Sequence, residues 1–189
     1  MNTRQIISSI GGLNADSIGV YAANHVPKLL STPAAIVTNL DTSDKPGSHW
    51  VAIYIDKNGH GIYFDSYGLA PVSKYHLDRL RKNCARFEYN KKQLQCVDSQ
   101  VCGEHCIMFL HHMCSGISLR KYLRPFSSNY SSNDRIAVKF YQSLLKRIKN
   151  KTTRHRRCRV NAFPRTSSTG LGLCNQICTS QSARFKLDI

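Results

Sequence analysis

Short apolar runs and polar breaks in the first half of the chain predict a β-sheet. Residues 34–40 are apolar and partly β-branched, which is typical of a buried strand. Residues 50–55 and 61–65 predict two more strands, and residues 57–59 between them suit a three-residue hairpin loop with Gly59 in the left-handed conformation. A further strand is expected at residues 87–89.

The hairpin also predicts a register. If Asp56 faces His60, then Val51 faces Asp65, and His49 lies diagonally across from Asp65 on the same face of the sheet. A slip of one residue would put the two side chains on opposite faces. The loop at residues 41–48 leads directly to His49.

Helical spacing predicts four helices around this sheet. Residues 5–13 form a short helix that ends at Gly11–Gly12, and residues 71–86 form an amphipathic helix outside the sheet. The helix that begins at Cys102 has an apolar stripe and ends before Gly116. The stripe comprises Cys102, Cys106, Phe109 and Met113. A last helix at residues 134–149 presents Ile136, Phe140, Leu144, Leu145 and Ile148 to the core.

The length and the charge distribution divide the chain. A chain of 189 residues with 41% hydrophobic residues can hold one α+β domain, assigned to residues 1–149, and a basic arm at residues 150–189. Residues 1–134 carry 14 Lys/Arg and 10 Asp/Glu, whereas residues 135–189 carry 13 and one. This asymmetry favours a polyanion, most simply DNA, as a partner, although a solvated basic tail is the simpler interpretation. The candidate DNA contacts are Lys146, Arg147, Lys149, Lys151, Arg154, Arg156, Arg157 and Arg159.

Hydropathy and cysteine use exclude two classes of protein. No run approaches the roughly 18 apolar residues of a membrane span, and the first residues lack the pattern of a secretory signal. Eight cysteines scattered through a normal composition fit a reducing compartment better than a disulfide scaffold. We therefore expect a protein that is neither secreted nor bound to a membrane.

Four residues supply the chemical groups of a thiol hydrolase. Cys102 is the candidate nucleophile, but the helix dipole contributes at most about 2 kcal/mol and cannot make it a thiolate unaided. His49 is expected to form an ion pair with the thiol, and Asp65 to orient the imidazole. The side chain of Gln95 and the backbone N–H of Cys102 are expected to bind the oxyanion. Gly103 keeps the approach to the thiol open.

The other sulfur and imidazole groups predict no second site. Part of the spacing of zinc ligands occurs in the C-terminal region, at His155, Cys158, Cys174 and Cys178. Neighbouring Arg residues would repel a cation, so no metal is expected. Cys106 is expected to be packed. We expect His105, His111 and His112 at the helix surface.

The same motifs resemble those of the adenovirus-type cysteine endopeptidases, the adenain family. They are His49–Trp50, Phe64–Gly68, Gln95 seven positions before Cys102, and Cys102–Gly103. The resemblance covers roughly residues 5–125. Adenoviral members generally carry Glu where this chain has Asp65, so the pattern is closer to proteases of Polinton/Maverick elements and to SUMO-deconjugating enzymes.

The resemblance implies a papain-like, adenain-like fold, with a mixed central sheet flanked by helices and the nucleophile at a helix N-terminus. It implies a monomeric endopeptidase that cleaves capsid and core precursors near Gly, in the virion or in the host nucleus or cytoplasm. It also implies stimulation by DNA and by a peptide that forms a disulfide with the cysteine at the place of Cys84, eighteen positions before Cys102. The chemistry itself would need no cofactor.

Three other functions remain open from the sequence. An isopeptidase that removes SUMO or a ubiquitin-like modifier uses the same four residues, although the chain has no evident insertion to grip a folded modifier. Acyl transfer from acetyl-CoA would need a nucleotide site that the sequence does not reveal. An inert nucleic-acid-binding packaging protein would not need all four groups.

Overall fold

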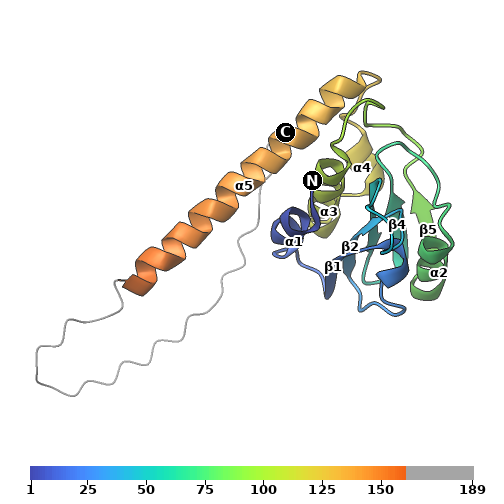
Figure 1. Ribbon diagram of the computed structural model, residues 1–189, viewed down its shortest axis with the longest axis horizontal. Helices are drawn as coiled ribbons and strands as arrows, with labels where there is room; N and C mark the ends of the chain where they lie inside the picture. The colour runs from blue at the N-terminus through green and yellow to red at the C-terminus, as the bar shows by residue number, and fades with distance from the viewer. Residues whose placement is uncertain (161–189) are drawn as a thin grey trace, which may run out of the picture.

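The central sheet has five strands in the part of the chain that the structure describes. The structure is a computed structural model that describes residues 1–160. The strands lie in the order of the sequence (Figure 1), β1 (Ser17–Tyr21), β2 (Ala34–Asn39), β3 (Trp50–Ile55), β4 (His60–Phe64) and β5 (Arg86–Tyr89). The two outer pairs are parallel and the two inner pairs antiparallel, which confirms an α+β domain with a mixed sheet.

The β3–β4 hairpin has the predicted register. Ala52 pairs with Phe64, Ile55 pairs with Gly61, and the Asp56 N–H donates to the His60 carbonyl at 3.0 Å. Gly59 has φ +75°, the left-handed conformation expected for this loop. The ends of the two strands that carry His49 and Asp65 therefore meet at the same edge of the sheet.

Strand β2 is buried along its whole length because both faces of the sheet are covered. Ala35 and Val37 pack toward α3 (Cys102–Cys114), whereas Ala34 and Ile36 pack with Leu80 of α2 (Lys74–Asn83). A strand with two covered faces has no polar alternation, which explains the continuous apolar run in the sequence. β1, which the sequence analysis missed, is half-buried throughout and gives no such signal.

The helices lie on both sides of the sheet, as Figure 1 shows. α1 (Thr3–Ile10), α3 and α5 (Tyr130–Val160) lie on one side, and α2 lies on the other. The short helices η1 (Ala23–His25) and α4 (Leu119–Leu123) complete the elements among residues 1–160. α1 and α2 start and end within three residues of their predicted bounds.

Helix α5 is longer than predicted; Phe140 and Leu144 pack against the core as predicted, whereas Ile136 does not. The helix starts four residues before Asp134 and ends eleven residues after Lys149, so the boundary predicted at 149/150 falls inside it. Ile136, predicted in the core, is 41% exposed, and Ala137 is the buried residue instead. Phe140 lies against the rings of His111 and His112, with centroids 5.6 and 5.4 Å away.

Aromatic packing fixes α3 on the sheet. The rings of Phe64 and Phe109 stack with centroids 4.4 Å apart, and Tyr122 of α4 meets both rings edge-on. Cys106 and Met113 are also buried, which confirms the predicted stripe of α3 below Cys102. Within the described residues, none of the helices has the length and apolar character to cross a membrane.

Candidate active site

The three residues predicted to act together lie at the ends of two strands and one helix. His49 directly precedes β3, Asp65 directly follows β4, and Cys102 is the first residue of α3. The antiparallel hairpin brings the first two together, and the packing of α3 on β3 brings Cys102 to the same place.

His49 and Asp65 form a buried pair. His49 Nε2 lies 2.9 Å from Asp65 Oδ1, and the Tyr67 N–H donates to the same oxygen at 2.8 Å. The Tyr67 ring stacks on the imidazole with centroids 4.8 Å apart. These contacts fix the orientation of the imidazole and leave Nδ1 for a partner on the other side.

Asn90, which the sequence analysis did not single out, fixes the backbone of Asp65. Its side chain accepts a hydrogen bond from the Asp65 N–H at 2.9 Å and donates to the Asp65 carbonyl at 2.6 Å. Asn90 is fully buried directly after β5. A single Asn after a strand is a common turn residue, so no sequence signal distinguished it.

The loop after Asp65 requires glycine at position 68. Gly68 has φ +74°, and a Cβ there would stand 2.7 Å from the carbonyl carbon of Lys92. Only glycine combines this conformation with so close a backbone approach. The Phe64–Gly68 motif therefore has a structural reason beside the role of Asp65.

Cys102 and His49 shift each other's protonation. Burial disfavours the thiolate of Cys102, but hydrogen bonds from His49 and from the backbone of Trp50 outweigh burial and lower its pKa. Burial also lowers the pKa of His49, but the hydrogen bonds to Asp65 and Cys102 raise it to about 9. Each group therefore favours the charged form of the other, the thiolate of Cys102 and the imidazolium of His49.

Two hydrogen bonds hold the side chain of Gln95 in place. Its Oε1 accepts a hydrogen bond from Ser66 Oγ at 2.6 Å, and its Nε2 donates to the Ser99 carbonyl at 2.9 Å. The residue is almost fully buried. One of the two amide hydrogens is therefore engaged, and the second remains to donate to a ligand.

The first residue of the chain lies against the start of α3. The Trp50 indole donates to the Met1 carbonyl at 3.2 Å, and a Cβ at Gly103 would stand 2.9 Å from Met1 Sδ. A side chain at position 103 would therefore require the Met1 side chain to shift.

His105 contradicts its predicted position at the helix surface. It is fully buried, and its Nε2 lies 2.9 Å from Asp134 Oδ1. The prediction was wrong because α5 covers this side of α3. His111 and His112 are half-buried against Phe140, so they are not simply at the surface either.

The remaining candidate residues lie elsewhere. Cys84 is half-buried at the end of α2, and burial raises the pKa of its thiol to about 11. Lys146, Arg147, Lys149 and Lys151 are exposed on α5. The side chains of Arg154, Arg156, Arg157 and Arg159, and the cysteines and histidine of the zinc-like spacing, lie outside the described part. Among the described residues no cluster of three potential metal ligands occurs.

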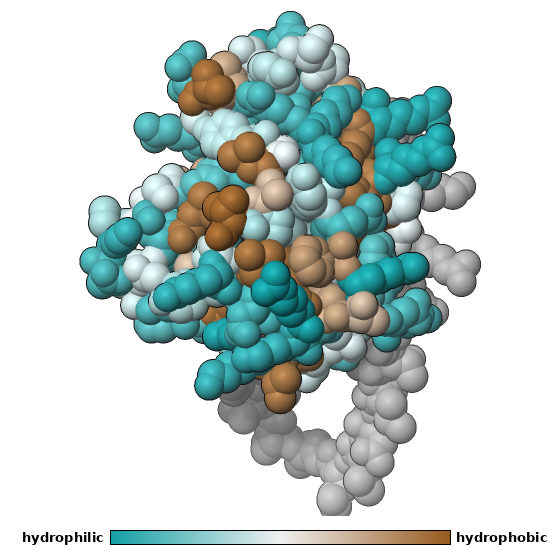
Figure 2. All heavy atoms as spheres, turned by 90° about the vertical axis from the view of Figure 1, so that its right-hand side faces the viewer, coloured by the Kyte–Doolittle hydropathy of each residue, from teal (hydrophilic) through white to brown (hydrophobic). Residues whose placement is uncertain are grey.

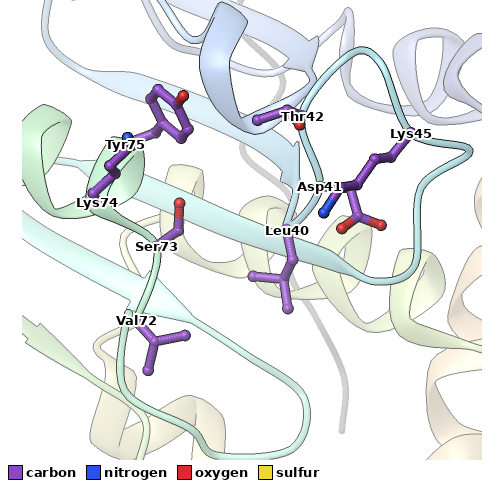
Figure 3. A pocket seen from close by; sticks show the side chains of 8 residues that line it. All are labelled: Leu40, Asp41, Thr42, Lys45, Val72, Ser73, Lys74 and Tyr75. Atoms are coloured by element: carbon purple, nitrogen blue, oxygen red, sulfur yellow. The ribbon is translucent and has the colours of Figure 1, made fainter.

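An open pocket of about 240 Å³ borders the loop that leads to His49. Its walls are the loop after β2 and the segment that enters α2, whose side chains face each other in Figure 3. None of the candidate catalytic residues lines it. The Leu40 N–H donates to the His49 carbonyl at 2.9 Å, so one wall is joined directly to the backbone of His49.

Exposed apolar side chains occur in the loops of the site. Leu69 is 59% exposed after the Asp65 loop, Val72 is 80% exposed before α2, and Val97 is 71% exposed after Gln95. Figure 2 shows apolar side chains gathered on the face that carries α2 and β5. Such residues are candidates to contact an extended polypeptide.

Comparison with known proteins gives one partial similarity. No family model matches the chain. Over 93 residues the chain is 34% identical to a protein of Acanthamoeba polyphaga mimivirus named "Putative thiol protease R355". The similarity covers 43% of this chain and 30% of that protein, so the chain spans less than a third of its relative. The chain is thus related over part of its length to a giant-virus protein named as a thiol protease.

Proposed function

We propose that this protein is a cysteine endopeptidase in which Cys102, His49 and Asp65 carry the reaction. The observation that carries the proposal is the buried His49–Asp65 pair, 2.9 Å apart, together with the influence of Asp65 and Cys102 that raises the pKa of His49 to about 9. The partial similarity to a viral thiol protease supports the same class of enzyme.

The reaction begins with attack of the Cys102 thiolate on the scissile carbonyl carbon. A C–S bond forms, and the carbonyl electrons move to the oxygen. The His49 imidazolium then donates its proton to the leaving amine, the C–N bond breaks, and a thioester remains. Neutral His49 next takes a proton from water, which attacks the thioester and releases the acid and the thiolate.

The oxyanion is stabilised in both steps by two donors. The Cys102 N–H belongs to the first turn of α3, where backbone N–H groups have no partner within the helix. The free amide hydrogen of Gln95 is the second donor. Removal of one such donor typically lowers kcat by about 10²–10³.

The substrates of this proposed enzyme are structural precursor proteins of a virus or a related element, cut beside small residues such as Gly. The exposed side chains of Leu69 and Val97 would contact apolar residues farther along the substrate.

Stimulation by DNA belongs to the same proposal. The exposed Lys146, Arg147, Lys149 and Lys151 on α5 support it. Lys and Arg contacts to phosphate release counterions, so the stimulation would weaken steeply with added salt. Activation by a peptide through Cys84 has less support, because a thiol with a raised pKa is a poor nucleophile for disulfide exchange at neutral pH.

The test is hydrolysis of a fluorogenic peptide library that contains Gly, by the wild type and by Cys102→Ala, with and without duplex DNA at low salt. Cys114→Ala is the matched control, because its thiol is half-buried in the same helix and burial raises its pKa to about 11. The proposal expects loss of turnover in Cys102→Ala alone, and a DNA-dependent rise in the other two proteins.

Unchanged turnover in Cys102→Ala would overturn the catalytic assignment. If the wild type cleaves no peptide but releases a ubiquitin-like modifier from a conjugate, the protein is a deconjugating enzyme. Salt-sensitive DNA binding without either activity would make it a packaging protein.

A further inference from the structure

The segment that carries Gln95 belongs to no strand or helix and needs other support. Residues 94–96 lie between β5 and α3. On one side the Ser66 carbonyl accepts hydrogen bonds from the N–H groups of Leu94 and Gln95 at 2.8 and 3.0 Å. On the other side the segment meets the start of α5.

Two adjacent residues of α5 hold that second side. Asn133 Nδ2 donates to the Leu94 carbonyl at 3.1 Å, and the Cys96 N–H donates to Asp134 Oδ2 at 3.2 Å. The two contacts fall on either side of Gln95. Asn133 is itself fixed, because its side chain exchanges two hydrogen bonds with the backbone of Ser127 at 2.9 and 3.1 Å.

The other carboxylate oxygen of Asp134 reaches the nucleophile helix. Asp134 Oδ1 lies 2.9 Å from Nε2 of His105, three residues after Cys102 in α3. Burial keeps His105 neutral, so its Nε2–H is the donor. The Asp134 carboxylate thus connects the segment that carries Gln95 with α3, which carries the Cys102 N–H. These are the two proposed oxyanion donors.

We propose that Asp134, assisted by Asn133, is a positioning residue that sets the distance between the Gln95 amide and the Cys102 N–H. This inference rests on the proposed function. The geometry supports it because a carboxylate is costly to bury, and hydrophobic packing of the same size would usually serve stability equally well. Asp134 is only 8% exposed, yet both its oxygens serve groups flanking the oxyanion site.

The first test measures kcat for Asp134→Ala, Gln95→Ala and the double variant. If Asp134 acts through Gln95, Asp134→Ala lowers kcat about tenfold or more, and the double variant is no slower than Gln95→Ala. Asp134→Asn should retain most of the activity, because the Asn side-chain oxygen can still accept from the Cys96 N–H, which lies next to Gln95. Phe140→Leu is the control for general loosening of α5.

The second test separates a displaced oxyanion donor from a damaged nucleophile. A peptide aldehyde adds to Cys102 and places an oxygen in the oxyanion site, whereas iodoacetamide alkylates Cys102 without forming one. In Asp134→Ala, the affinity for the aldehyde should fall by the same factor as kcat falls. The rate at which iodoacetamide alkylates Cys102 should stay at the wild-type value.

Three results would overturn the inference. They are a wild-type kcat in Asp134→Ala, losses that simply add in the double variant, and alkylation that slows as much as kcat does. A wild type with no hydrolysis and no fast alkylation of Cys102 would instead refute the proposed function, and the inference with it.

Discussion

The protein contains two buried histidine–aspartate pairs of the same length and opposite behaviour. The Nε2–Oδ1 distance is 2.9 Å both in His49–Asp65 and in His105–Asp134. The pKa of His49 is raised to about 9, whereas the pKa of His105 is lowered because burial outweighs its hydrogen bond to Asp134. The first pair favours an imidazolium and the second a neutral imidazole.

The second ring nitrogen accounts for the difference. His49 also bonds to Cys102, whose thiolate stabilises the added positive charge. Nδ1 of His105 is buried with no hydrogen-bond partner among the described residues, so nothing stabilises a second proton. An aspartate at hydrogen-bond distance therefore does not by itself make a buried histidine cationic.

Replacing each of the two aspartates by Asn should have very different effects on kcat. Asp65→Asn places an amide beside His49 Nε2 and favours the wrong tautomer, so kcat should fall by about 10⁴, as in a serine protease triad. Asp134→Asn should change kcat little. Steady-state hydrolysis of one peptide by both variants tests this contrast, and similar losses in both would remove the distinction between the pairs.

The pH dependence of hydrolysis should follow the first pair alone. The thiolate–imidazolium state exists above the lowered pKa of Cys102 and below the pKa of His49 at about 9. We expect kcat/KM to be flat in this window and to fall about tenfold per pH unit above pH 9, since deprotonated His49 cannot protonate the leaving amine. A fall that begins near pH 6.5 would mean that His49 is unperturbed.

The two histidines should affect stability with opposite signs. The pKa of His49 is raised in the folded protein. Its stabilising contribution to the free energy of unfolding is therefore complete below 6.5, the pKa in the unfolded chain, and is lost as pH rises through about 9. His105 has a lowered pKa, so its contribution is complete above 6.5 and is lost as pH falls. His76, with a pKa lowered to about 4, and His111 add to the acid loss.

Urea unfolding between pH 4 and pH 10 measures these contributions. Replacing His105 by Gln should flatten the acid side of the stability curve, because Gln does not titrate and the lowered pKa of His105 no longer contributes. His49→Ala should flatten only the alkaline side. A change on the same side in both variants would contradict the opposite signs.

The stacked ring on His49 should have the smallest effect. Tyr67→Leu removes a ring 4.8 Å from the imidazole, and such contacts are worth about 0.5–1.5 kcal/mol, so kcat/KM should fall by roughly two- to tenfold. Tyr67→Phe keeps the ring and should match the wild type. Equal losses in both variants would assign the effect to the hydroxyl instead.

The sequence was sufficient to predict the hairpin register and hence the meeting of His49 with Asp65, because two-residue periodicity and a three-residue loop leave few alternatives. It was not sufficient for contacts between distant elements. Asn90 and Asp134 act on Asp65 and Cys96 from 25 and 38 residues away, through single polar side chains without any periodic pattern. His105 was misplaced for the same reason, since only the tertiary structure places α5 over it.

The most direct test is the pH dependence of Cys102 alkylation by iodoacetamide, followed on the Cys102 peptide by mass spectrometry in the wild type and in His49→Ala. Cys84 and Cys114, with pKa values raised to about 11, serve as slow internal references. The wild type should show fast alkylation with a midpoint well below the ordinary thiol value of about 8.5, and His49→Ala should return the midpoint to that value or above it. An ordinary or raised midpoint in the wild type, unchanged in His49→Ala, would contradict the thiolate–imidazolium pair on which the proposed function depends.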